Sequence, residues 1–310
     1  MSQVESVQKL VDQLQSMWDV LGPFQIVIAE ALRWSVAMAV IVMGLGILYS
    51  RRRRFVGTTM VAPFRWSCAA LLVLGCDDAY RRIVVSDASF AEALNFTSAA
   101  ATFCPMMAVL GAKRPQNVGW QLIVLTLWAV LTLPVAEMLV LWQGGTLDLG
   151  PAREWMLIIL IVVGLANYVL TRFGAASCLF AIGQSFVLWR HLPLPDSLNA
   201  IPNPRSIGTM LIVVAVFVVW FQTRTQSTSS NWDQVWGQFR DMFGLVWGLR
   251  VMERVNSTGK IGDWKTELQW TGFQPSTGWD PEEAEAIEKT MRTLLRRFLS
   301  TEWIDARLKS

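Results

Sequence analysis

Long apolar runs, separated by short polar segments, fill most of the chain up to residue 222. An α-helix needs about 20 predominantly apolar residues to cross the ~30 Å hydrocarbon core of a bilayer. The pattern therefore predicts an all-α integral membrane protein whose region 23–222 crosses the bilayer as seven transmembrane helices. We place these spans at about 24–50, 57–76, 94–112, 118–142, 155–171, 174–189 and 206–222.

The clearest of these spans lies at 118–142, where Trp120 and Trp142 bracket an apolar run. Tryptophan is enriched at membrane–water interfaces, so this pair indicates the two ends of a crossing helix. At 1.5 Å per residue the run is longer than the hydrocarbon core. We therefore expect the helix to tilt, or to kink at Pro134.

Four consecutive arginines, Arg51 to Arg54, follow the first span directly. Arginine and lysine next to a span favour its cytoplasmic side, so we expect an N-outside, C-inside topology. The span at 57–76 contains Arg65 and is less apolar, but it places Lys113 and Arg114 on the same side as the four arginines. The compact loops are typical of a multi-pass protein of the plasma (bacterial inner) membrane.

Residues 1–22 form a predicted amphipathic helix on the extracytoplasmic side, which Gly22 and Pro23 end. Its apolar positions follow alternating steps of three and four residues, as in a coiled-coil seam. Two interpretations stay open for this seam. It docks a protein partner or a second copy of the chain, or it packs on the outer surface of its own bundle.

The polar linker 223–230 leads to a predicted cytoplasmic domain at 231–310 that is mostly helical. The pattern Ser230-Asn-Trp-Asp233 resembles a capping box, and an apolar stripe with helical period follows it. Residues 264–270 alternate polar and apolar side chains, so the domain holds at most one short strand or hairpin. Asp280 and Pro281 predict the start of a last long helix.

The first helix of this domain allows two interpretations. Its apolar stripe forms the core of a small α-rich domain, or it lies in the plane of the inner leaflet. Basic residues such as Arg240 and Arg250 suit the leaflet, but Asp233 and Asp241 on the same helix do not.

The composition of the chain excludes several kinds of binding site. Of the 310 residues, 53% are hydrophobic and 16% charged, and the net charge of +3 is too small to indicate nucleic-acid binding. The single histidine, His191, excludes a metal site built on several imidazoles. The four cysteines lack CxxC spacing and are interpreted as packing residues. We expect no metal and no cofactor.

Ionisable groups within spans are functional candidates, because placing them in lipid is costly. Glu30 and Arg33 in the first span are three apart on one helix face and can neutralise each other. Glu137 and Arg65 remain as candidates, and Asn95, Asn167 and Gln184 are expected to satisfy them across helices. Glu137 either serves as a proton or cation site or bonds to the backbone freed at Pro134.

A second polar group is expected on the outer face, in a loop at 77–92. It consists of Asp77, Asp78, Arg81 and Arg82. Enzymes that act on lipid phosphates hold a divalent metal on several convergent carboxylates. This loop lacks further acids at a converging spacing, so we interpret it as solvated.

No Walker A, GxSxG or HExxH motif occurs. We therefore expect a non-catalytic membrane anchor or a subunit of a membrane complex. It would contact the lipid bilayer and bind a protein partner, or itself, through the N-terminal helix and the tail. One alternative is a secondary transporter that uses Glu137. Another is an intramembrane enzyme on lipid substrates that uses Asp77 or Asp78.

Overall fold

The computed structural model describes residues 35–83, 88–140, 147–194, 201, 203–223, 232–275 and 279–308. It is mostly helical, with a single two-stranded sheet in the described part of the chain. The predicted N-terminal helix at 1–22, the beginning of the first span and most of the linker (224–230) lie outside the described residues.

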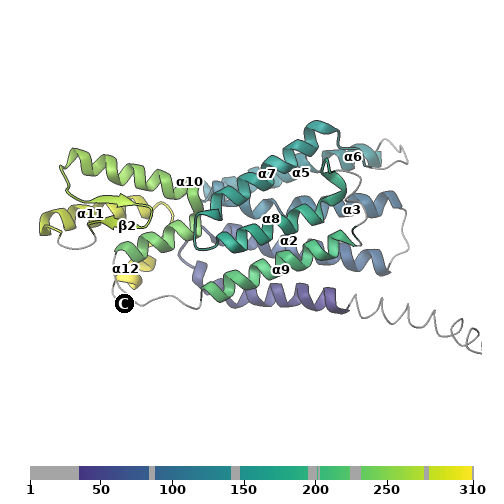
Figure 1. Ribbon diagram of the computed structural model, residues 1–310, viewed down its shortest axis with the longest axis horizontal. Coiled ribbons are helices and arrows are strands. Elements are labelled where there is room, and N and C mark those ends of the chain that lie inside the picture. The colour runs from purple at the N-terminus through teal and green to yellow at the C-terminus, as the bar shows by residue number, and fades with distance from the viewer. Residues whose placement is uncertain are drawn as a thin grey trace, which may run out of the picture.

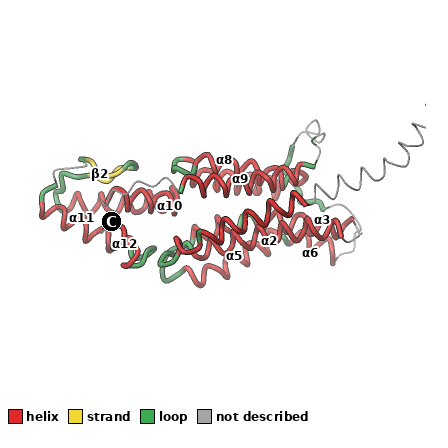
Figure 2. Tube along the Cα trace, turned by 90° about the horizontal axis from the view of Figure 1, so that it is seen from below, coloured by secondary structure: helices red, strands yellow, loops and turns green. Residues whose placement is uncertain are grey.

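Helices that run back and forth between two ends form the larger part of the molecule (Figure 1). The view from below separates these helices into two rows, with α8 and α9 in one and α2, α3, α5 and α6 in the other (Figure 2). These helices are Ser35–Ser50, α2 (Val61–Ile83), α3 (Ala88–Ala101), α4 (Cys104–Leu110), α5 (Asn117–Leu131), α6 (Leu133–Val140), α7 (Pro151–Val169), α8 (Gly174–Val187) and α9 (Pro204–Gln222).

Several of these helices are compatible with membrane insertion. Within the described residues, Ala88–Leu110, Pro151–Val169 and Pro204–Gln222 are long and apolar enough to cross a bilayer. A fourth crossing results if the bent pair α5 and α6 is one span. Ser35–Ser50 and α8 are apolar but shorter.

The helices differ in how deeply they are buried. In Ala88–Leu110, 72% of the most apolar window is buried inside the protein, against 17% for α7 and 22% for α9. The first segment is therefore central, and the other two present apolar side chains outward. Met210 on α9 is more than half exposed, and so are Val118 and Leu122 on α5. Such a surface is suited to contact with lipid tails.

The kink expected in the span at 118–142 is confirmed. α5 and α6 meet at an angle of 48°, and the helix breaks at Thr132, two residues before Pro134. Proline has no N–H to donate, and its ring clashes with the carbonyl of the preceding turn. The break therefore lies within the turn that precedes Pro134, where the proline disrupts the helical hydrogen bonds.

The predicted loop at 77–92 is wrong at both ends. α2 continues to Ile83, and α3 already begins at Ala88, so Asp77, Asp78, Arg81 and Arg82 are all helical. Charged residues after an apolar run suggested that the helix had ended. It continues because Asp77 is neutralised inside the protein by Arg205.

The remainder of the chain forms a small domain at one end of the bundle (Figure 1). It consists of α10 (Trp232–Ile261), a hairpin of β1 (Glu267–Gln269) and β2 (Gly272–Gln274), α11 (Pro281–Leu295) and α12 (Thr301–Leu308). The prediction of an α-rich domain with one short hairpin is confirmed.

The apolar stripe of α10 is the core of this domain. Trp236, Phe239 and Phe243 are fully buried, and Phe298 packs edge-on against the last two with ring centroids 5.2 Å apart. Because this face is covered by protein, the in-plane membrane interpretation of α10 is wrong. The predicted capping box begins at Ser230, outside the described residues. Asp233 accepts the N–H of Phe273 on β2 at 2.7 Å.

Candidate functional site: a buried polar cluster and the junction with the C-terminal domain

A buried polar cluster joins α2, α3 and α9 near the end of the bundle remote from the C-terminal domain. Its centre is Arg205, which forms an ion pair with the fully buried Asp77. The same guanidinium donates to the side-chain and backbone oxygens of Asn95 and to Ser98 Oγ. Arg81, one turn after Asp77, donates to its other carboxylate oxygen at 3.2 Å.

Local sequence positions these groups. Pro204 occupies the first turn of α9, where its missing N–H costs nothing, and so places Arg205 in that turn. Asp77 and Arg81 are four apart and share one face of α2. The Asp77 carboxylate therefore has cationic partners from two helices. Among the described residues, no group of three or more His, Cys, Asp or Glu side chains could hold a metal ion.

His191 lies beside this cluster. Its ring packs edge-on against Phe96, with centroids 4.9 Å apart, and its Nε2 has no partner within the described residues. Burial, together with Arg190 and Arg205, lowers the pKa of His191 to about 4. The imidazole is therefore neutral at physiological pH.

The structure does not bring Glu137 and Arg65 together. Glu137 pairs with Arg153, at the start of α7, at 3.3 Å. Both side chains of this pair are more than a third exposed, and Arg65 is exposed on α2. Glu137 thus binds a neighbouring cation rather than the backbone freed at Pro134.

The three amides expected to satisfy these groups bond elsewhere. Asn95 binds Arg205, and Gln184 donates to the side chain and carbonyl of Thr102, at the break between α3 and α4. Asn167 accepts the N–H of Val246 at 3.0 Å, beyond the bundle. The prediction that they serve Glu137 and Arg65 is therefore wrong.

The other two residues of the predicted outer-face group, Asp78 and Arg82, follow Asp77 and Arg81 on α2. The side chain of Arg82 is outside the described part.

The contact of Asn167 is part of a close junction between the bundle and the C-terminal domain. α10 bends at Gly244, whose φ is +76°, and Asn167 fills the bend. Tyr168 donates to the carbonyl of Met242 at 2.9 Å. Asp241, nearly fully buried, pairs with Arg172 at 3.1 Å. The bend in α10 is thus held on several sides by the end of α7.

Two tryptophans of the C-terminal domain donate their indole N–H groups to helix ends of the bundle. Trp247 binds the carbonyl of Val109 in α4, and Trp270 binds the carbonyl of Leu170 after α7, both at 3.0 Å. The last carbonyls of a helix lack partners within the helix. The tryptophans satisfy such groups and so fix the domain against two helices.

Backbone bonds complete the junction. Thr59 N–H donates to the carbonyl of Phe298, and Ser300 N–H to that of Gly57. Arg114 N–H donates to the carbonyl of Arg297. The two basic turns of the bundle, after Ser50 and after Leu110, are therefore attached directly to the segment between α11 and α12.

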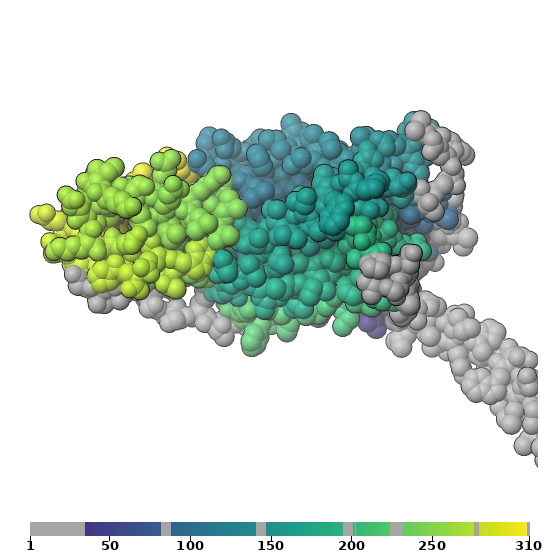
Figure 3. All heavy atoms as spheres, turned by 45° about the horizontal axis from the view of Figure 1, so that its top comes forward, coloured from purple at the N-terminus to yellow at the C-terminus, as the bar shows by residue number. Residues whose placement is uncertain are grey.

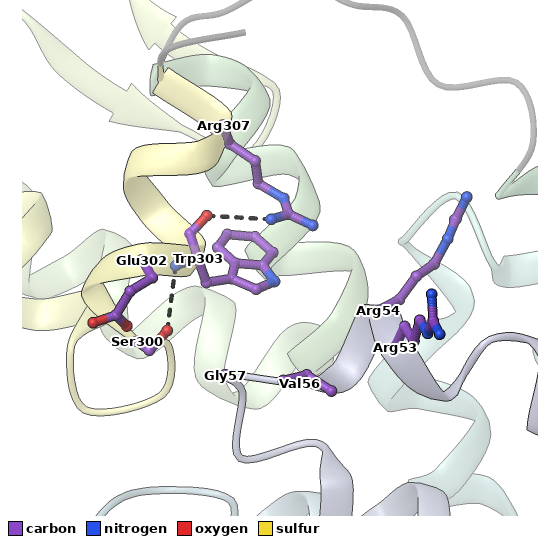
Figure 4. A pocket seen from close by; sticks show the side chains of 8 residues that line it. All are labelled: Arg53, Arg54, Val56, Gly57, Ser300, Glu302, Trp303 and Arg307. Carbon is purple, nitrogen blue, oxygen red and sulfur yellow. Dashed lines mark hydrogen bonds between the residues drawn. The ribbon is translucent and has the colours of Figure 1, made fainter.

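A pocket of about 520 Å³ opens at this junction, between the 3-10 helix η1 (Arg52–Phe55) and α12 (Figure 4). Its lining includes Arg53, Arg54, Val56, Glu302, Trp303 and Arg307. Arg307 stacks over the indole of Trp303 at 3.5 Å and donates to Gln238. Positive charge thus converges from two segments far apart in the sequence.

No family model, curated protein sequence or solved structure matches this chain. Its function must therefore be argued from its own residues.

Sequence reasoning missed the groups that organise both sites. The span predicted at 206–222 excludes Arg205, although Pro204 is typical of the first turn of a helix and α9 begins there. Asp241 was noted as a charge that does not suit lipid, and it proves to be buried at the junction. Trp303 carried no signal beyond its aromatic character.

Proposed function

We propose that this protein is a non-catalytic membrane anchor or subunit of a membrane complex in the plasma (bacterial inner) membrane. In this proposal seven helices cross the bilayer, with the N-terminus outside and the C-terminal domain in the cytoplasm. The arrangement of the basic turns supports this sidedness. Arg51 to Arg54 and Lys113 with Arg114 lie at the end of the bundle where the C-terminal domain docks (Figure 1). The positive-inside rule favours the cytoplasm for such an end.

The observation that carries the proposal is the close junction. The C-terminal domain is tied to the bundle by tryptophan N–H groups, by backbone bonds and by the Arg172–Asp241 pair. A domain held in this way keeps a defined orientation to the membrane, which suits the presentation of a docking surface. Partner binding or self-association would use this domain together with the N-terminal helix.

Two alternatives have less support. A transporter would use Glu137, but this residue sits in a partly exposed pair with Arg153. A lipid enzyme would use Asp77 or Asp78, but Asp77 is fully buried and already bonded to two arginines. Flux driven by a pH gradient and lost in Glu137→Gln would favour the first alternative. Lipid turnover lost in Asp78→Asn would favour the second.

Gentle-detergent purification tests the proposal. We expect a partner in stoichiometric amount or a defined oligomer, retained in a Glu137→Gln control. A clean monomer from the native membrane would overturn the proposal. Sidedness is tested separately by cysteine labelling of Lys113→Cys and Lys260→Cys in a background that lacks the native cysteines. We expect an impermeant reagent to label both only after permeabilisation, and labelling of intact cells would contradict the topology.

A further inference from the structure

The pocket between η1 and α12 has an excess of positive charge. Arg53 and Arg54 approach from η1, Arg307 approaches from α12, and Glu302 is its one acidic lining residue within the described chain (Figure 4). The Arg205 cluster, by contrast, places a carboxylate between its guanidiniums. The described lining of the pocket therefore carries three arginines against one carboxylate.

Arg54 lies close enough to Arg307 for their charges to interact across the pocket. Burial and the charge of Arg54 lower the pKa of Arg307 to about 10. Burial, followed by the charges of Arg51 and Arg172 outside the lining, lowers the pKa of Arg54. An anion beside Arg54 and Arg307 would offset the repulsion between them, because an opposite charge favours the charged form of each group.

A neutral donor at the same place also lacks a partner. Trp303 is only 6% exposed, and its indole Nε1 has no acceptor among the residues that the structure describes. Leaving a buried donor unsatisfied costs about 1–3 kcal/mol. The indoles of Trp247 and Trp270, a short distance away, do have backbone acceptors. The unpaired Trp303 N–H therefore indicates a ligand that accepts hydrogen bonds.

The position of the pocket indicates the source of that ligand. η1 directly follows the apolar helix Ser35–Ser50, and Arg51 and Arg54 donate to the carbonyls of Trp220 and Thr223, at the end of α9. Tyr49 and Val56 are each more than 60% exposed beside it. The space-filling view shows the C-terminal domain abutting the helix ends (Figure 3). Lipid headgroups lie at this level of a membrane protein.

We propose that this pocket binds the phosphate of an anionic phospholipid headgroup from the cytoplasmic leaflet. Arg53, Arg54 and Arg307 pair with the phosphate, and the Trp303 N–H donates to it. Guanidinium–phosphate bonds are charge-assisted, and basic pockets at the cytoplasmic ends of membrane helices suit such headgroups. The inference rests on the proposed sidedness, which places this end of the bundle in the cytoplasm.

Titration of the purified full chain in phosphatidylcholine-containing micelles tests this site. Short-chain phosphatidylglycerol is the probe, and binding is followed by native mass spectrometry. Arg53→Gln should weaken binding about tenfold, the effect of losing one charge-assisted bond. The matched control is Arg52→Gln, from the same arginine run. Arg52 stacks on Tyr49 and does not line the pocket, so its removal should change affinity less than about twofold.

The acid of the pocket provides a test in the opposite direction. Glu302 is exposed at its rim, so Glu302→Gln removes a repulsive charge without disturbing the core and should strengthen phosphatidylglycerol binding several-fold. Trp303→Phe retains an aromatic ring, although a smaller one, and removes the donor, and it should weaken binding. If that variant is unstable, the opposite responses of Arg53→Gln and Glu302→Gln still test whether the pocket binds phosphatidylglycerol.

Three outcomes would overturn the proposal. Equal losses in Arg52→Gln and Arg53→Gln would show attraction to general surface charge. Binding of inorganic phosphate that phosphatidylglycerol does not displace would assign the pocket to a soluble anion. Equal affinity for phosphatidylcholine would exclude recognition of anionic headgroups. None of these bears on whether a partner co-purifies or on cysteine labelling, so this site and the proposed function can fail separately.

Discussion

Arg205, in the first turn of α9, forms an ion pair with Asp77, which is fully buried on α2. The two residues are far apart in the sequence, and their bond connects the last helix of the bundle to its centre. Asn95 and Ser98 of α3 accept further hydrogen bonds from the guanidinium. This arrangement explains why α2 accommodates a carboxylate at a depth where apolar residues surround it.

Removing one partner of this pair should destabilise the bundle strongly. Arg205→Gln leaves the Asp77 charge buried with only Arg81 beside it, so we expect a loss of about 3–5 kcal/mol in the free energy of unfolding. The double variant Asp77→Asn with Arg205→Gln should lose less than the sum of the single effects, because no unpaired charge remains. Thermal unfolding in detergent measures both. Strict additivity would show that the two side chains are not coupled.

The exposed pair Glu137–Arg153 should contribute far less to the free energy of unfolding than the pair Asp77–Arg205. Both side chains are more than a third exposed, so solvent screens their attraction. We expect Glu137→Gln to change the free energy of unfolding by less than about 1 kcal/mol. A loss comparable to that of Arg205→Gln, under the same conditions, would mean that this pair is much better shielded than its exposure indicates.

The bend in α10 depends on a glycine. Gly244 has φ +76°, and a Cβ there would lie 2.4 Å from Asn167 Nδ2 and 2.6 Å from the Asn167 carbonyl oxygen. Gly244→Ala should therefore cost at least about 1–3 kcal/mol and loosen the junction. Gly237, on the same helix, has no atom within 4 Å of such a Cβ. Gly237→Ala should be neutral or stabilise the protein by up to about 1 kcal/mol.

Limited proteolysis gives the matching readout for that comparison. Cleavage between the bundle and the C-terminal domain should become faster in Gly244→Ala and stay unchanged in Gly237→Ala. The opposite order would show that the bend is not needed for docking.

A second pair of glycines sets the distance between α8 and α9. A Cβ on Gly208 would lie 2.6 Å from the carbonyl oxygen of Gly183 and 2.7 Å from the backbone nitrogen of Val187. Small residues permit such close approach of membrane helices. Gly208→Ala should cost about 1–3 kcal/mol by overpacking. Gly46→Ala, where space is open, serves as the control in the same unfolding assay.

His191 should make stability depend on pH in a defined window. Its pKa is lowered from 6.5 to about 4 in the folded protein. Above pH 6.5 the imidazole is neutral in both states and has no effect. Between pH 6.5 and 4 the unfolded state binds a proton that the folded state does not. The free energy of unfolding therefore decreases by up to about 1.4 kcal/mol for each unit by which the pH is lowered.

The control for this titration is His191→Leu, which should lose that part of the pH dependence while the carboxylates continue to titrate. Because the chain has a single histidine, its imidazole can also be followed by NMR without assignment ambiguity. A folded-state titration near pH 6.5 would contradict the buried placement.

Local pattern was sufficient for elements whose determinants lie within a few residues. The kink near Pro134 follows from a missing N–H, and the first strand of the hairpin lies within the alternating segment 264–270. The stripe of α10 follows from helical periodicity, whereas its place in a core was decided by the packing of Trp236 and Phe239. The sequence could not say that α2 continues past Asp77, because that depends on a cation on α9.

Hydropathy and periodicity by themselves determined that the chain is a helical protein with membrane-compatible spans and a separate C-terminal domain. These properties depend on residues close together along the chain. Only the tertiary structure decided which polar groups meet: Asp77 with Arg205, and Asn167 with the bend at Gly244. Polar contacts require two partners at bonding distance, and segments separated by many residues acquire that distance only when the helices pack.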